Sequence, residues 1–188
     1  MVKRSFRRLL PAAAGLALSA CTMAGISSFM LVTPGGHDLF SYAATKGDVR
    51  IVVLNNPFAI SQAEVETAMA QALDKVPPTG PKATYSAHPR EGSKTAIRFV
   101  FTFDPVPSQS QQEMCREDVM PAKAPGGDLL KMLVVLCDGG TLQSWATAII
   151  NRPATPQDPA FQSMIRNGVW VQIPIADPLV NGGCDDDC

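Results

Sequence analysis

The sequence predicts an α+β fold: an antiparallel sheet of four to five strands with one main helix, over about residues 61–76, packed on one face as a two-layer sandwich. Three patterns indicate this fold. Residues 50–54 are a short β-branched run, residues 61–76 repeat apolar side chains at helical spacing, and residues 97–103 alternate between two faces. Because each segment has an apolar face to bury, helix packed on sheet accommodates all three.

The first predicted strand is followed directly by the main helix. Residues 50–54 end at Asn55-Asn56-Pro57, and an apolar run bounded by turn residues is typical of a buried strand. Ser61 and Glu64 have the spacing of a capping box, which satisfies free N–H groups at the start of a helix. The apolar stripe of this helix, predicted over about 62–75, consists of Val65, Met69, Ala72, Leu73 and Val76.

Further strands are predicted in the second half of the chain. Residues 97–103 place four large apolar side chains on one face, and residues 129–137 are apolar on both faces, as in a central strand. Asp138-Gly139-Gly140 is a turn signal, so residues 141–150 are predicted to return as a hairpin partner. A helix over 141–150 is the alternative, because Leu142, Trp145 and Ile149 also share a helical face. Residues 83–87 are predicted to form a brief strand.

The remaining segments are predicted to be a loop fastened by a disulfide and, toward the C-terminus, a short helix followed by a strand. Residues 108–128 are a long polar connection, for which Cys115 is a candidate staple. Asp158 is predicted to cap a short helix over 159–167 that ends at Gly168, and residues 169–173 to add an edge strand. The expected core includes Ile51, Val53, Val65, Met69, Leu73, Phe99, Phe101, Val134, Leu136 and Trp145.

A basic and then apolar segment begins the sequence. Four basic residues precede an apolar run over 9–18, and Ser19-Ala20 are the small residues that a signal peptidase requires. Leu18-Ser19-Ala20-Cys21 resembles the lipobox of bacterial lipoproteins. This resemblance, confined to residues 1–22, implies that Cys21 is lipidated and that cleavage occurs before it. It further implies a periplasm-facing, lipid-anchored envelope protein, for which Thr22, in place of Asp, favours the outer membrane.

Two other interpretations of the N-terminal segment stay open. The uncharged run over 9–32 is long enough to span a bilayer as an uncleaved anchor, although Pro11 and Gly15 dilute it. An ordinary secretory signal, with Cys21 incidental, is the second.

Under the lipoprotein interpretation the chain divides into four parts. These are a signal peptide (1–20), the lipidated Cys21 with a flexible tether (21–48), a single α+β domain (49–176) and an acidic, Cys-containing tail (177–188). The tether is indicated by Thr33-Pro34-Gly35-Gly36, which interrupts any regular element.

Four cysteines follow Cys21, namely Cys115, Cys137, Cys184 and Cys188. An even number of cysteines in an exported protein predicts disulfides, and four cysteines allow three connectivities. We favour Cys115–Cys137, because the first ends a loop and the second ends an apolar strand. Cys184 and Cys188 would then pair with each other or stay free.

Charge and motifs limit the functional classes. Removing residues 1–20 leaves twelve basic against 17 acidic residues, a net charge of −5, which argues against nucleic acid or anionic lipid as a ligand. No nucleophile elbow, phosphate loop, dinucleotide fingerprint or zinc-protease motif occurs. Only two histidines are available, His37 in the tether and His88 in a proline-rich loop. We therefore expect no catalytic residue, no cofactor and no metal site.

These features predict a non-enzymatic lipoprotein that binds or helps to assemble another envelope component, whether protein, peptidoglycan or lipid. The alternative is a tethered periplasmic hydrolase that draws on His88, Asp104 and Asp138, which requires these three side chains to converge in one cleft. A third hypothesis gives Cys184 and Cys188 a structural or redox-sensing role.

Overall fold

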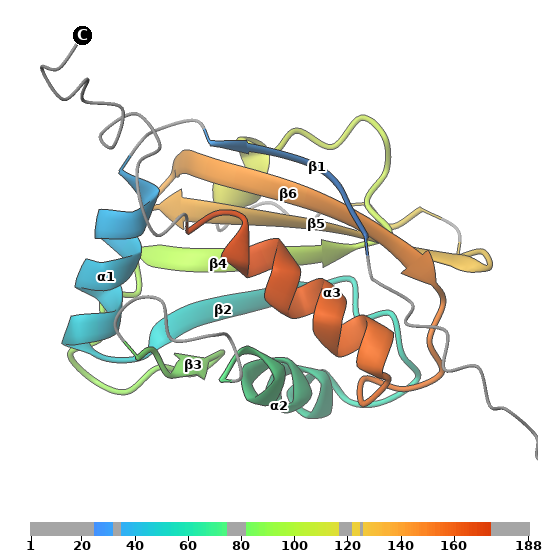
Figure 1. Ribbon diagram of the computed structural model, residues 1–188, viewed down its shortest axis with the longest axis horizontal. Helices are drawn as coiled ribbons and strands as arrows, with labels where there is room; N and C mark the ends of the chain where they lie inside the picture. The colour runs from blue at the N-terminus through green and yellow to red at the C-terminus, as the bar shows by residue number, and fades with distance from the viewer. Residues whose placement is uncertain (1–24, 32–34, 75–81, 117–121, 125, 174–188) are drawn as a thin grey trace, which may run out of the picture.

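The computed structural model describes residues 25–31, 35–74, 82–116, 122–124 and 126–173. They form one six-stranded sheet with three α-helices and one turn of 3₁₀ helix (Figure 1). In chain order the elements are β1 (Gly25–Leu31), α1 (Gly36–Lys46), β2 (Val49–Leu54), α2 (Gln62–Leu73), β3 (Tyr85–Ser86), β4 (Ile97–Phe103), η1 (Glu113–Cys115), β5 (Leu129–Asp138), β6 (Thr141–Asn151) and α3 (Pro159–Trp170).

The sheet is mixed, which corrects the expectation of a purely antiparallel one. Its strand order is β1-β6-β5-β4-β2-β3. The pairs β1–β6, β6–β5 and β5–β4 are antiparallel, whereas β2 is parallel to both β3 and β4. The crossover through α2 explains this difference, because a connection that contains a helix returns the chain in the direction in which it left. The general α+β class holds.

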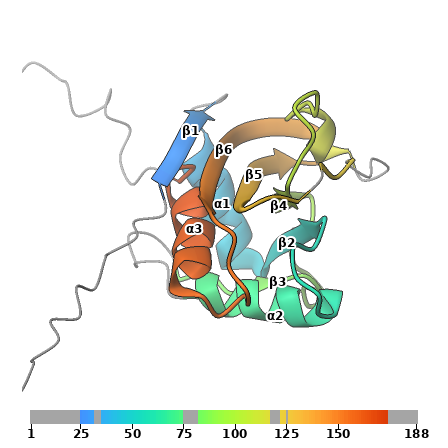
Figure 2. The same cartoon turned by 90° about the vertical axis from the view of Figure 1, so that its right-hand side faces the viewer.

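All three helices cover one face of the sheet, which we call the inner face (Figures 1 and 2). Side chains from each helix, including Phe40 of α1, Met69 of α2 and Phe161 of α3, join the inner residues of the strands in the main core. Phe161 also packs against the rings of Phe58 and Phe103, with centroids 5.0 and 5.6 Å away. This cluster joins the start of α3 to β4 and to the chain that precedes α2.

The opposite, outer face carries a second and smaller core. Buried outward-facing residues of β4 and β5 pack against the 3₁₀ turn η1, and the members of this cluster are Val100, Met114, Cys115, Leu133, Val135 and Cys137. Trp145, expected in the main core, lies partly buried against this second cluster. The other nine expected core residues are all in the main core.

The N-terminal part of the folded unit corrects the expected tether over 21–48, because β1 and α1 lie within it. β1 pairs with β6 along its length, and α1 buries Phe40 and Ala43 against the inner face. The start of α1 gives no strong sequence signal, since its N-cap is Gly35 and no side chain caps it. The expected domain boundary at 49 is therefore not a boundary of the fold.

The main helix and the hairpin were predicted correctly. α2 begins at a complete capping box, in which Ser61 and Glu64 each bond the other's backbone N–H. β5 and β6 pair from Leu129↔Asn151 to Asp138↔Thr141, so the helical alternative for 141–150 is wrong.

The C-terminal prediction was wrong in its boundary. α3 begins at its predicted cap, Asp158, but runs on to Trp170, so the expected edge strand over 169–173 does not form. Gly168 lies inside the helix, where an added Cβ would lie 2.7 Å from Met132 Cε and 3.0 Å from Val134 Cγ1. This glycine therefore permits a close approach of helix and sheet and does not end the helix.

Candidate functional site

The candidate site is the edge of the sheet formed by β1 and its neighbours. β1 is the terminal strand of the sheet and pairs only with β6 among the described residues. It carries no charged residue, and Phe29, Met30 and Leu31 are exposed by 56, 53 and 40%. A strand edge offers unpaired N–H and C=O groups, and most edges are protected by charge or proline. β1 has neither, although it does contain a bulge.

That bulge fixes the register of β1 on β6. The regular pairing shifts between Ile26, opposite Ala148, and Ser28, opposite Thr147. The hydroxyls of Ser27 and Ser28 both lie within hydrogen-bond distance of Thr147 Oγ1, at 2.8 and 2.6 Å. After the bulge, Phe29, opposite the inward-facing Ala146, lies on the inner face, and Met30, opposite Trp145, lies on the outer face.

The exposed apolar residues are concentrated at this edge. Eight large apolar side chains are exposed among the described residues, and five of them lie on β1, β5 and β6: Phe29, Met30, Leu31, Leu129 and Ile149. Isolated exposed apolar residues are common, but three consecutive ones on an edge strand, as Phe29, Met30 and Leu31 are, are typical of an interaction surface.

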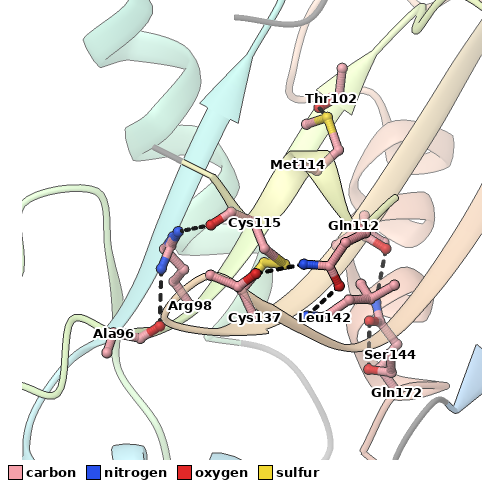
Figure 3. The surroundings of a disulfide bond; sticks show 12 residues. Ala96, Arg98, Thr102, Gln112, Met114, Cys115, Cys137, Leu142, Ser144 and Gln172 are labelled. Carbon is pink, nitrogen blue, oxygen red and sulfur yellow. Dashed lines mark hydrogen bonds between the residues drawn. A yellow bond between two sulfur atoms is a disulfide. The ribbon is translucent and has the colours of Figure 1, made fainter. Parts of the chain in front are cut away.

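The disulfide Cys115–Cys137 confirms the favoured pairing and fastens the loop across the outer face (Figure 3). Two side chains add to this attachment. The buried Arg98 donates to the carbonyl of Cys115 at 2.7 Å, and Gln112 donates to Gly140 O and accepts from Leu142 N. The turn η1 therefore covers part of the outer face of β4 and β5, and the disulfide and these hydrogen bonds hold it there.

The end of α3 is fastened next to β1. Ser144 Oγ donates to Gln172 Oε1 at 2.9 Å, and both side chains are buried. Ser144 is also the β6 partner of Leu31. This hydrogen bond therefore ties β6 to the chain that follows α3 at the point where β1 ends, and it stabilises the edge there.

The three residues of the hydrolase hypothesis do not converge. β4 pairs with β5 from Ile97↔Asp138 to Phe103↔Met132, so Asp104 and Asp138 lie at opposite ends of β4, about 20 Å apart. His88 follows β3, at the far edge of the sheet, and its Nε2 lies 3.7 Å from Glu66. Asp104 forms an ion pair with Arg152. No shared cleft contains these side chains.

The other sequence candidates are placed as follows. His37 lies on α1, with Nδ1 3.5 Å from the neighbouring Asp38. Cys21, Cys184 and Cys188 lie outside the described residues, so the lipidation site and the tail stay predictions. Within the described ranges, no group of three or more His, Cys, Asp or Glu side chains is arranged to hold a metal ion. No helix there has the length and apolar character needed to cross a membrane.

The shifted pKa values belong to groups that hold the fold together. The backbone N–H of Arg90 and the hydroxyl of Thr84 lower the pKa of Asp48. Hydrogen bonds from Ser61 lower the pKa of Glu64 in the capping box. Burial raises the pKa of Tyr85. Perturbed groups gathered in a cleft would suggest catalysis, but the Asp48 and Glu64 shifts come from hydrogen bonds within loops and a helix cap, and the Tyr85 shift from burial in the core.

Among the described residues, two grooves lie outside the β1 edge: one of about 420 Å³ beside the disulfide, lined in part by Arg98 and Cys115, and a second at α2. The second has a volume of about 480 Å³ and lies between α2 and the loop before α3, where Thr67 and Gln71 face Thr155 and Pro156. Its lining contains no histidine or cysteine, and Glu64, its one carboxylate, is engaged in the capping box. This second groove offers no catalytic pair.

Sequence reasoning missed the β1 edge. Residues 25–31 follow an apolar signal-like segment, which masked the strand. The sequence signal for this strand was a stretch of seven residues without charge or proline. Ser27 and Ser28 make this stretch too polar for a membrane span. Comparison with protein-family models, with curated proteins and with solved structures finds no match for this chain.

Proposed function

We propose that this protein is a lipoprotein of the bacterial envelope, anchored through Cys21, that binds a protein component of the envelope by adding a strand of that partner to β1. Its role is binding or assembly and not catalysis. The observation that carries the proposal is the uncharged edge of β1, which has no second strand partner among the described residues and which exposes Phe29 and Leu31.

Strand addition uses the chemistry that β1 presents. The backbone of an extended partner segment supplies hydrogen bonds to the unpaired edge, and side chains next to the edge select the partner sequence. Phe29 and Leu31 lie on the inner face of β1, beside Ala146 and Ser144 of β6. Because β1 has no charge, an apolar extended segment meets no desolvation penalty from an ionised side chain here.

The bulge at Ser27 and Ser28 limits the pairing site to one part of β1. A bulge disturbs the regular spacing of edge groups, which protects that half of the strand. Phe29, Met30 and Leu31 follow the bulge in regular register with β6. The partner strand is therefore expected to pair with residues 28–31.

The anchor is tested by changing Cys21 to Ala in the producing cell. The expected result is loss of lipid labelling and of cleavage before residue 21, measured by mass spectrometry of the purified chain. A cleaved protein that never carries lipid would instead indicate an ordinary secretory signal. An unchanged full-length membrane protein would indicate an uncleaved anchor.

The binding role is tested by photo-crosslinking in intact cells. A photoreactive amino acid at Phe29 is expected to give a discrete protein adduct. The same residue at Glu91, which is exposed in the loop before β4, is the matched control and is expected to give none. A Leu31→Lys change should abolish the adduct at Phe29, because a charge at the edge opposes strand addition. Equal adducts from both positions, or none from Phe29, would contradict the proposed role.

A further inference from the structure

The outer face of the sheet has exposed apolar residues near the end of β1 and on the parts of β5 and β6 that lie beside its start. We call the exposed residues Met30, Leu129, Lys131 and Ile149 the outer-face patch. Pairing places Gly25 and Lys131 on either side of Ile149, and Met30 opposite the partly buried Trp145. The apolar members are exposed by 53, 47 and 41% for Met30, Leu129 and Ile149.

The outward direction of the patch follows from strand alternation. Leu133, Val135 and Cys137 belong to the outer core, so Leu129 and Lys131 of the same strand also face outward. The disulfide-fastened loop packs on the β4–β5 part of this face. The patch lies on a part of this face that the described residues of the loop leave exposed.

The length of chain before β1 determines how far the patch can lie from the anchor. Only three residues separate Cys21 from Gly25, which limits the Cα–Cα distance between them to about 14 Å. Gly25 is the direct neighbour of Ile149. A lipid on Cys21 therefore holds the patch close to the bilayer, whereas the tether expected over 21–48 would have allowed free reorientation.

We propose that the outer-face patch rests on the surface of the bilayer that holds the acylated Cys21, so that the domain has a second membrane contact and a fixed orientation. This inference rests on the lipid anchor of the proposed function. Met30, Leu129 and Ile149 enter the boundary between headgroups and acyl chains, and Lys131 extends its ammonium group to the lipid phosphates.

The local charge of the patch is more compatible with a lipid surface than the net charge of the chain is. Lys131 is the one charged residue among positions 129, 131, 133, 135 and 137 of β5, and the outward positions of β1 and β6 within these described strands carry none. The net charge of −5 therefore does not bear on this face, and zwitterionic lipid is sufficient for contact.

Backbone chemistry limits the depth of the contact. The unpaired N–H and C=O groups of β1 cannot enter the hydrocarbon without a large desolvation penalty. The face therefore lies in the interface and leaves the edge of β1 in water. A partner strand can still reach β1 there, so membrane contact and strand addition are compatible.

Tryptophan quenching in vesicles tests the orientation. The acylated full-length mature protein, with Trp145→Phe and Trp170→Phe, receives one reporter, Met30→Trp in the patch or Ile60→Trp as the control. Ile60 is also exposed, by 39%, but precedes α2 on the side of the helices. The proteins are placed in phosphatidylcholine vesicles whose acyl chains carry bromine, which quenches nearby indoles. Quenching at position 30 is expected to exceed that at position 60 severalfold.

A second variant shows whether the patch causes the difference. Leu129→Glu with Ile149→Glu should reduce quenching at position 30 to the level at position 60, while the acyl chains keep the protein on the vesicles in flotation. Both changes are at exposed sites, and circular dichroism checks that the fold is retained. Equal quenching at positions 30 and 60 in acylated protein would overturn the inference and leave the anchor intact. Mass spectrometry that shows an unmodified Cys21 would instead refute the anchor, and the inference with it.

Discussion

Arg152 Nη2 donates to Asp104 Oδ2 at 2.8 Å, and the Asp104 side chain is only 4% exposed. This pair joins the end of β4 to the end of β6, and Arg152 also donates to the carbonyls of Gly127 and Leu129. Removing one partner of a buried pair leaves an uncompensated charge. Arg152→Ala is therefore expected to lower the free energy of unfolding by about 3 kcal/mol.

Urea denaturation followed by circular dichroism measures this effect. The informative comparison is between Arg152→Ala and the double variant that also carries Asp104→Asn, since the double variant leaves no buried charge unpaired. It should be more stable than Arg152→Ala alone. If Arg152→Ala unfolds at the same urea concentration as the unchanged protein, the pair does not contribute as inferred.

Gly168→Ala is expected to destabilise the protein even though it improves helix propensity. Because the added Cβ would meet two buried side chains, overpacking is expected to cost about 3 kcal/mol, the upper end for such changes, which exceeds the propensity gain of about 1 kcal/mol. Met132→Leu removes the Cε that lies 2.7 Å from the added Cβ, so the same change should cost less in that background. Thermal unfolding of the unchanged protein, of Gly168→Ala, of Met132→Leu and of the double variant gives the coupling free energy between the two changes. Purely additive effects would show that the close contact with Met132 is not the cause.

Loss of the disulfide is expected to cost about 3 kcal/mol, because it closes a segment of 22 residues in the unfolded chain. The measurement is the stability of two proteins, each with and without reductant. One is the double variant that carries both Cys115→Ala and Cys137→Ala, and the other is the unchanged protein. The unchanged protein should lose stability in reductant, and the double variant should not. A stable outer-face loop in the double variant, detected as unaltered Trp145 fluorescence in proteins that also carry Trp170→Phe, would show that packing of Met114 suffices without the bond.

Asp48 is expected to contribute to stability at neutral pH and to lose that contribution in acid. It accepts from the Thr84 hydroxyl at 2.7 Å and from the Arg90 N–H at 3.0 Å, which favours its ionised form and lowers its pKa. Because the folded-state pKa lies below the unfolded one, the stabilisation is present above about pH 4 and is lost as pH falls through the folded value.

Asp48→Asn should therefore cost about 1 kcal/mol at pH 7, a modest figure because solvent partly screens the site. The difference from the unchanged protein should disappear toward pH 2, measured by urea denaturation across the pH range. A difference that stays constant with pH would show that hydrogen-bond geometry, and not ionisation, is responsible.

The sequence by itself determined the elements that local chemistry specifies. The capping box of Ser61 and Glu64 fixes the start of α2, and Asp138-Gly139-Gly140 fixes the β5–β6 hairpin. Both signals lie within a few residues of the structure that they set. The pairing of Cys115 with Cys137 was also favoured from sequence, since each ends a recognisable loop or strand.

Only the tertiary structure decided the features that carry the proposals. β1 is a strand because β6, about 120 residues later in the chain, pairs with it, as Ser28 does with Thr147. α3 continues through Gly168 because that glycine fits against Met132, and the two parallel strand pairs follow from the way α2 crosses over the sheet. These outcomes depend on contacts between distant segments, for which a single local pattern contains no information.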